Sequence, residues 1–131
     1  MIAVYDTNVI VSALWTPQGK ASALLREVIS GKVNLCFDER MMSEYREVLL
    51  RPKFRFSASL VNSILELVQS TGLSVVPPTI SNIDFPDEED IAFFEVAQFC
   101  HAPLVTGNLK HYPSDPLVIT VSDFYETYIL R

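Results

Sequence analysis

Short apolar runs alternate along the chain with longer stretches in which apolar residues recur every three or four positions. A run of about five apolar residues is typical of a buried strand, and the longer spacing is typical of a helix with one buried face. The apolar runs predict strands at 1–5, 33–37, 73–76, 103–106 and 117–121. The helical spacing predicts helices at 20–30, between Asp38 and Pro52, at 57–70, at 87–101 and from Ser122 to Leu130.

This alternation predicts an α/β fold, in which a mainly parallel sheet lies between two layers of helices as a three-layer α/β/α sandwich. The 131 residues fall within the usual size of one domain, so we expect a single domain over residues 1–131. In sheets of this kind, sites form beyond the carboxyl ends of the strands. This rule directs attention to Asp6 after the first strand, and to Thr106 and Asn108 at the fourth.

Charge and composition limit the partners. The chain has 16 acidic and 10 basic residues and a net charge of −6, which argues against general attraction to nucleic acid or anionic membrane and leaves room only for local basic patches. No apolar run approaches the roughly 18 residues of a membrane-spanning helix, and no secretory signal is visible. Cys36 and Cys100 lie in apolar contexts and are interpreted as reduced core thiols. We therefore expect a soluble, cytoplasmic protein without a membrane partner.

Glu44 is the acid of the helix after Asp38 that is best placed to enter a cleft. It lies about 40° from Val48 on the helix wheel, at the edge of the buried stripe. The alternative is a solvated carboxylate that pairs with Arg40 or Arg51. Helix geometry taken alone favours that alternative.

The densest acidic run of the chain spans residues 84–90, where Asp and Glu favour the start of a helix. Asp87 and Asp90 have the spacing of a capping box, so capping is one interpretation of both. Asp90 also lies next to Ala97, at the edge of the apolar face, and is the acid of this run best placed to enter the cleft. Asp87 is the second, and Glu95 is expected to point into solvent.

Four oxygen donors could therefore meet at one end of the sheet. Asp6 ends a strand, Glu44 edges a helix, Asp90 opens another helix and Asn108 follows a strand. Hard ions such as Mg²⁺ and Mn²⁺ take oxygen ligands and keep several water molecules, so they suit such a set. Zinc is disfavoured, because the two histidines and two cysteines form no spaced ligand cluster.

Four segments match a known family in order and spacing. They are Asp6-Thr7-Asn8-Val9, Ser43-Glu44-Tyr45, Asp87-Glu88-Glu89-Asp90 leading into Phe93, and Thr106 to Pro113. With them the chain resembles, over essentially its whole length, the PIN-domain ribonucleases (named after the PilT N-terminus), especially the toxins of type II toxin–antitoxin systems. The resemblance implies a parallel sheet between helices, a divalent-metal site and metal-assisted hydrolysis of RNA that leaves 5′-phosphate and 3′-hydroxyl ends.

Carried over to this chain, the resemblance makes Asp6, Glu44 and Asp90 the acidic metal site for Mg²⁺ or Mn²⁺, with Asn108 as a further catalytic residue. Asn108 stands where many relatives have a fourth acid, and an amide supplies no negative charge, so the site should hold metal less tightly. The alternative function is a catalytically weakened PIN-like domain that binds RNA or a protein without cutting.

Supporting roles follow from neighbouring positions. Thr106 could orient Asp90 or Asn108 by hydrogen bonding, and Asn8 could do the same for Asp6. Both could equally well stabilise turns.

RNA would be held by local cations. The candidates are Lys110, His111, Arg51, Lys53 and Arg55. Phe54 and Phe56 are interpreted either as stacking surfaces for bases or as anchors of a helix connection in the core, and the second is favoured.

Two protein partners are expected as well. The resemblance implies a homodimer and a cognate antitoxin. Val61 and Leu65 look exposed on the helix at 57–70, beyond the one stripe that the core needs, and are a candidate contact surface.

Overall fold

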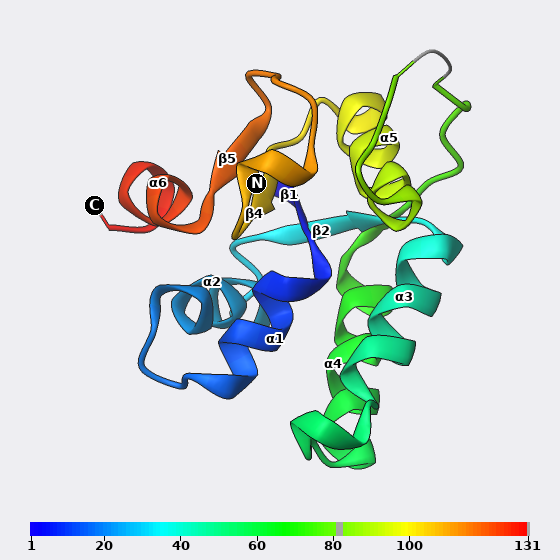
Figure 1. Ribbon diagram of the computed structural model, residues 1–131. Helices are drawn as coiled ribbons and strands as arrows, with labels where there is room; N and C mark the ends of the chain where they lie inside the picture. Colours follow the sequence, from blue (N-terminus) through cyan, green and yellow to red (C-terminus); the bar gives the residue numbers. More distant parts are fainter. Residues whose placement is uncertain (81–82, 131) are drawn as a thin grey trace.

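The computed structural model describes residues 1–80 and 83–130, and within them five parallel strands form one sheet (Figure 1). The strands are β1 (Ile2–Tyr5), β2 (Asn34–Phe37), β3 (Leu73–Ser74), β4 (Leu104–Thr106) and β5 (Val118–Thr120), in the order β3-β2-β1-β4-β5. β1 is central, with Ala3 opposite Leu35 of β2 and Val4 opposite Leu104 of β4. All neighbouring pairs are parallel, so the sheet is wholly rather than mainly parallel.

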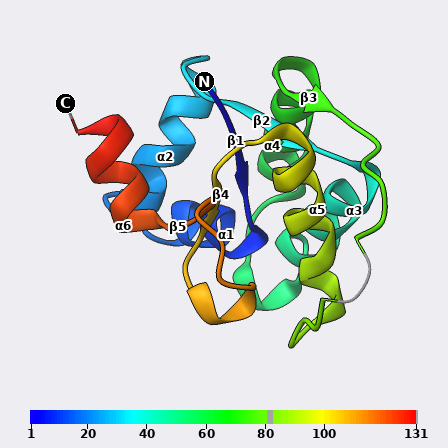
Figure 2. The same ribbon diagram turned by 90° about the horizontal axis from the view of Figure 1, so that it is seen from above.

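Helices cover both faces of the sheet. They are α1 (Thr7–Trp15), α2 (Lys20–Ile29), α3 (Glu39–Leu49), α4 (Ala58–Thr71), α5 (Ile91–Cys100) and α6 (Val121–Phe124). Three short 3-10 turns, η1 (Pro52–Phe54), η2 (Glu88–Asp90) and η3 (Leu109–His111), and a π-helical turn (Tyr125–Ile129) complete the described elements. Figure 2 shows α1, α2 and α6 on one side of the sheet and α3, α4 and α5 on the other. This arrangement confirms the predicted three-layer α/β/α sandwich.

The end of β1 is held by two tyrosines. Its residues Ala3, Val4 and Tyr5 are fully buried, as expected for a strand with helices on both faces. The hydroxyl of Tyr45, on α3, donates a hydrogen bond to the carbonyl oxygen of Tyr5, and the hydroxyl of Tyr5 donates to the carbonyl oxygen of Leu24, on α2, at 3.1 Å. These two hydrogen bonds connect both helical layers to the end of β1, and Asp6 is the next residue of the chain.

α1 was not predicted from the sequence. Its run Val9-Ile10-Val11 consists of β-branched residues, which favour strands over helices. Asp6 starts the helix, because its carboxylate accepts a hydrogen bond from the backbone N–H of Val9 at 3.2 Å. Packing of the buried Val9, Ile10 and Ala13 then stabilises a helix that its own sequence does not favour.

The helix predicted at 87–101 differs in its first turn. Residues Glu88–Asp90 form the 3-10 turn η2, and the α-helix begins only at Ile91. Asp87 caps this turn, since its carboxylate accepts a hydrogen bond from the N–H of Glu89 at 3.0 Å. The predicted strand at 73–76 is also shorter, with Leu73–Ser74 in the sheet before Pro77 and Pro78, which lack the N–H that a ladder needs.

The last α-helix begins at Val121, one residue before the predicted start at Ser122. Thr120 caps the helix by accepting a hydrogen bond from the backbone N–H of Asp123 at 3.0 Å. Thr120 is also the last residue of β5, so the helix follows the strand directly, with no loop between them.

Val61 and Leu65 are buried, so the prediction that they form an exposed contact surface is wrong. α4 packs against both α3 and β2, and two adjoining stripes of its surface are therefore covered. In the part of the chain that the structure describes, no helix combines the length and apolar character needed to cross a bilayer.

Candidate active site

Asp6 lies at the carboxyl end of β1 and is only 4% exposed. Besides capping α1, it accepts a hydrogen bond from the hydroxyl of Thr106 at 2.5 Å. Burial raises the pKa of Asp6 above its usual value, and the hydrogen bonds from Thr106 and from the backbone N–H groups of Val9 and Asn8 oppose this shift. The protein therefore holds a carboxylate at the strand end where water solvates it poorly.

Thr106 hydrogen-bonds to Asn108, as predicted, but through the backbone of Asn108, and its side-chain partner is Asp6. Its hydroxyl donates to Asp6, whereas the sequence suggested Asp90 or Asn108 as the oriented side chain. The same hydroxyl oxygen accepts from the backbone N–H of Asn108 at 3.1 Å. The end of β4 is thus joined directly to the end of β1, because the register places these two strands side by side.

Glu44 projects from α3 into the space beside α1. It is half-buried, and the hydroxyl of Thr7 donates a hydrogen bond to it at 3.4 Å. Its two predicted surface partners pair elsewhere: Arg40 with Asp38 and Glu95, and Arg51 with Glu47. Burial raises the pKa of Glu44, and the charge of Glu89 raises it further. The interpretation as a solvated ion-paired carboxylate therefore does not hold.

Asp90 is the second half-buried acid of this region. Burial raises its pKa to about 6, the charge of His111 opposes the shift, and the charges of Asp87 and Asp6 add to it. No hydrogen bond reaches its carboxylate from the described residues, and it does not cap α5 through its side chain. Its carboxylate oxygens are therefore available to a ligand, in contrast to those of Asp87, one of which is bonded to the turn.

One cavity of about 280 Å³ brings the predicted acids together. It is lined by Asp6, Thr7, Asn8, Glu44, Val48, Arg51, Pro86, Asp87, Glu89, Asp90, Phe93 and His111. Glu89 is a member that the sequence analysis missed, although it belongs to the same acidic run. Lys53, Arg55, Lys110 and Asn108 do not line the cavity.

Asn108 caps a turn and does not line the cavity. Its side-chain oxygen accepts a hydrogen bond from the backbone N–H of Lys110 at 3.0 Å and so caps η3. Its side-chain nitrogen lies 3.3 Å from Nε2 of His111. The structure thus places Asn108 behind His111, and His111 itself at the cavity.

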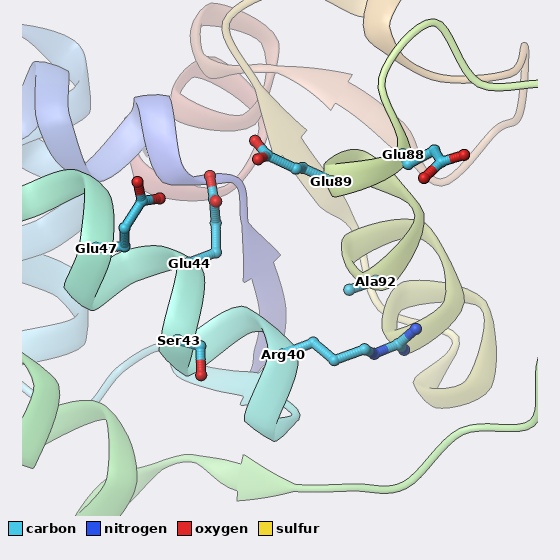
Figure 3. A pocket seen from close by; sticks show the side chains of 7 residues that line it. All are labelled: Arg40, Ser43, Glu44, Glu47, Glu88, Glu89 and Ala92. Carbon is cyan, nitrogen blue, oxygen red and sulfur yellow. The ribbon is translucent and has the colours of Figure 1, made fainter.

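A second, wider groove of about 420 Å³ adjoins the cavity and shares Glu44 and Glu89 with it. In Figure 3, Glu44 from α3 and Glu89 from η2 extend toward one another, whereas Glu88 points away. The remaining lining residues are Arg40, Ser43, Glu47 and Ala92. This side of the molecule is therefore strongly acidic.

Glu95 is buried, so the prediction that it points into solvent is wrong. It is 2% exposed, and its carboxylate accepts hydrogen bonds from the guanidinium of Arg40 at 2.7 Å and from the backbone N–H of Ile80 at 2.6 Å. Arg40 also pairs with Asp38 at 2.7 Å. Arg40 and Glu95 thus join α3, which carries Glu44, to α5, which begins directly after Asp90.

The donor set of the cavity suits a hard divalent cation. Asp6, Glu44 and Asp90 offer carboxylate oxygens, and burial raises the pKa of each of the three, so added positive charge would stabilise their ionised forms. Within residues 1–80 and 83–130, no three acidic, histidine or cysteine side chains lie close enough together to hold an ion as they stand. Repulsion between uncompensated carboxylates is a physical reason for such spacing.

Two comparisons with known proteins give a match. Residues 3–110 match the family profile described as PIN domain. The chain is also 31% identical over 108 residues to the uncharacterized protein MJ1680 of Methanocaldococcus jannaschii, an alignment that covers 80% of this chain and 69% of that protein. The comparison with solved structures gives no match.

Proposed function

Because the chain belongs to the PIN-domain family, whose members are as a rule nucleases, we propose that it is a divalent-metal-dependent endoribonuclease. The observation that carries the proposal is the meeting of Asp6, Glu44 and Asp90 in one cavity at the carboxyl end of the central strand. These carboxylates come from three separate elements, and the pKa of each is raised, chiefly by burial. Mg²⁺ or Mn²⁺ would supply that charge.

The three carboxylates would hold the ion. Bound there, a divalent cation polarises a phosphodiester and lowers the pKa of water for hydrolysis. Thr106 fixes the orientation of Asp6 through its hydrogen bond, and Thr7 does the same for Glu44. Asn8 and Asp87 line the cavity as supporting residues.

Cations at the rim would bind phosphate. His111 and Arg51 line the cavity, and Lys110 lies in the same turn as His111. Asn108 supports His111 from behind, at 3.3 Å, and is a positioning residue in this account. The acidic groove beside the cavity would repel RNA, so the strand should enter from the side of Arg51 and His111.

A toxin of a toxin–antitoxin pair is the biological role that we propose for this ribonuclease, in the cytoplasm. The acidic groove formed by Glu44, Glu47, Glu88 and Glu89 suits a cationic segment of a cognate antitoxin. A homodimer is proposed from the general frequency of two-fold assemblies, no longer from Val61 and Leu65.

The second candidate function is an RNA- or protein-binding module without cleavage. Two observations favour it: Asn108 caps a turn where a fourth acid would add charge, and the described carboxylates form no ready three-ligand group. Such a module would bind RNA equally well with and without Mn²⁺.

Cleavage of a fluorescently labelled single-stranded RNA pool distinguishes the two functions. We expect fragments with Mn²⁺ or Mg²⁺, none with EDTA, and at least 100-fold slower cleavage by Asp6→Asn and Asp90→Asn variants, since each removes a charged ligand. Glu88→Gln is the matched control, because Glu88 is exposed and points away from Glu44. Equal cleavage by Asp6→Asn and wild type would refute the proposed site.

A further inference from the structure

Three aromatic rings gather at the far end of α1, outside the cavity. Trp15 ends α1, and its ring centroid lies 5.4 Å from that of Phe54 and 6.2 Å from that of Phe56, edge to face in both cases. Phe54 and Phe56 stack on each other at 5.6 Å. Phe56 packs against the hydrophobic core, whereas Trp15 is 57% exposed. Phe56 therefore anchors the cluster to the core, and Trp15 forms its exposed aromatic surface. The sequence analysis did not single out Trp15.

Two segments of the chain link this aromatic cluster to the proposed active site. Asn8, which lines the cavity, and Trp15 are seven residues apart on α1 and so lie on the same face of the helix, about two turns and about 10 Å apart. Ser12 lies between them on that face and is exposed. Arg51 also lines the cavity, and it directly precedes η1, whose last residue is Phe54.

Positive charge accompanies the rings. Lys53 and Arg55 flank Phe54 and are exposed, and neither forms an ion pair with any other described residue. Nζ of Lys53 lies 5.1 Å from the centroid of the Phe54 ring. In a chain of net charge −6, cations next to an exposed indole are a combination that suits a nucleic-acid strand.

We propose that Trp15, supported by Phe54 and Phe56, is a base-stacking platform for single-stranded RNA, with Lys53 and Arg55 contacting the phosphates of the same strand. The platform rests on the proposed ribonuclease function and specifies its substrate as unpaired RNA. At roughly 3.4 Å per stacked nucleotide, about three nucleotides lie between the cavity and Trp15. The strand therefore occupies the cavity and the platform together only when it is longer than a dinucleotide.

Trp15 is the one tryptophan of the sequence, so its fluorescence reports directly on the platform. The titration uses octauridylate in EDTA, where no metal-dependent cleavage occurs. We expect saturable quenching of Trp15 emission by octauridylate, much weaker quenching by diuridylate, and none by a ribose–phosphate chain of the same length that lacks bases.

Variants are compared by the anisotropy of labelled octauridylate. Trp15→Ala should raise Kd about 5- to 100-fold, the loss of one stacked base, and Trp15→Phe should restore most of the affinity. Phe99→Ala is the matched control. Phe99 is a similarly exposed aromatic residue, at 52%, and lies near the C-terminal end of α5, outside the aromatic cluster. Circular dichroism verifies that each variant folds.

Octauridylate binding that leaves Trp15 emission unchanged, or that survives Trp15→Ala, overturns the platform. So does an emission shift that grows with protein concentration in the absence of RNA, since a second copy of the chain then covers Trp15. Failure of the proposed function is a separate result: quenching without Mn²⁺-dependent cleavage leaves the platform in place and removes the ribonuclease. Cleavage without quenching does the reverse.

Discussion

Asp90 is the acid of the cavity whose charge changes near neutral pH. Its pKa is raised to about 6 in the ion-free protein, mainly by burial. Between about pH 4 and pH 6, the folded protein keeps a proton that the unfolded chain has released, so the free energy of unfolding falls as the pH rises through this range. Above about pH 6, Asp90 is ionised in both states, and the full cost of its buried charge lowers the free energy of unfolding.

Replacing Asp90 by Asn removes this penalty. We expect Asp90→Asn to stabilise the ion-free protein by about 1 kcal/mol at pH 7.5, a value discounted for the half-exposed side chain, and to give no gain below about pH 4. Thermal melts in EDTA across this pH range measure the effect. Asp84→Asn, in the same acidic run but exposed, is the control. A gain from Asp90→Asn that is the same at pH 4 and pH 7.5 would contradict the assignment.

Substitutions of Thr106 test whether its hydrogen bond to Asp6 stabilises the fold. Thr106→Val removes the donor at 2.5 Å and leaves a buried carboxylate with fewer hydrogen bonds, so we expect a loss of about 1–3 kcal/mol in the free energy of unfolding at pH 7. Thr106→Ser keeps the hydroxyl and should lose less, mainly through the missing methyl group. Chemical denaturation of both variants measures the difference, and equal losses would show that the hydrogen bond contributes nothing.

The three acids that the sequence pointed to, Asp6, Glu44 and Asp90, line one cavity. They could be named because Asp6 follows a strand, and Glu44 and Asp90 lie at the edge of an apolar helix face. The same reasoning missed the capping role of Asn108. A side-chain amide after a strand has the same sequence signal whether it faces a ligand or caps the next turn, and here it accepts from Lys110. Glu89 was missed because a 3-10 turn rotates its side chain differently from the α-helix assumed for 87–101.

Local sequence patterns predict a helix or strand correctly where that element buries one face only. α1 fails this rule because its β-branched residues are typical of strands, and α4 fails it in part because two neighbours cover it. Glu95 shows that a charged position on a predicted helix surface can be covered by a distant loop, here through Ile80. Long-range contacts of this kind leave no signal in a helix wheel.

The turn from α4 to β3 requires glycine. A Cβ atom on Gly72 would lie 2.3 Å from the carbonyl oxygen of Leu35 and 2.5 Å from that of Val68. Both are backbone atoms, so Gly72→Ala has to displace α4 from β2, and we expect a loss of at least about 2 kcal/mol. Gly107→Ala is the matched control, since nothing lies within 4 Å of its added Cβ. Equilibrium unfolding of the two variants tests this, and equal stability of Gly72→Ala and wild type would contradict the packing described.

On the scale of the whole molecule, the acidic side and the cationic aromatic side have opposite consequences for RNA. The groove with Glu44, Glu47 and Glu89 repels phosphate, while Arg51 and the neighbouring Lys53 attract it. The fold was predictable from the alternation of strands and helices, because parallel sheets need helices on both faces. The target of the proposed ribonuclease and the proposed protein partner were not, because they depend on the chemistry of molecules outside this chain.

Calorimetric titration with Mn²⁺ tests the central claim, that Asp6, Glu44 and Asp90 form one divalent-cation site. At pH 7.5 we predict one Mn²⁺ ion per chain for wild type and for Glu88→Gln, and at least about tenfold weaker binding for Asp6→Asn, Glu44→Gln and Asp90→Asn. The same loss in all three variants would tie three elements of the fold to one ion. Absence of saturable Mn²⁺ binding to the wild type, or unchanged affinity in the three variants, would contradict the account.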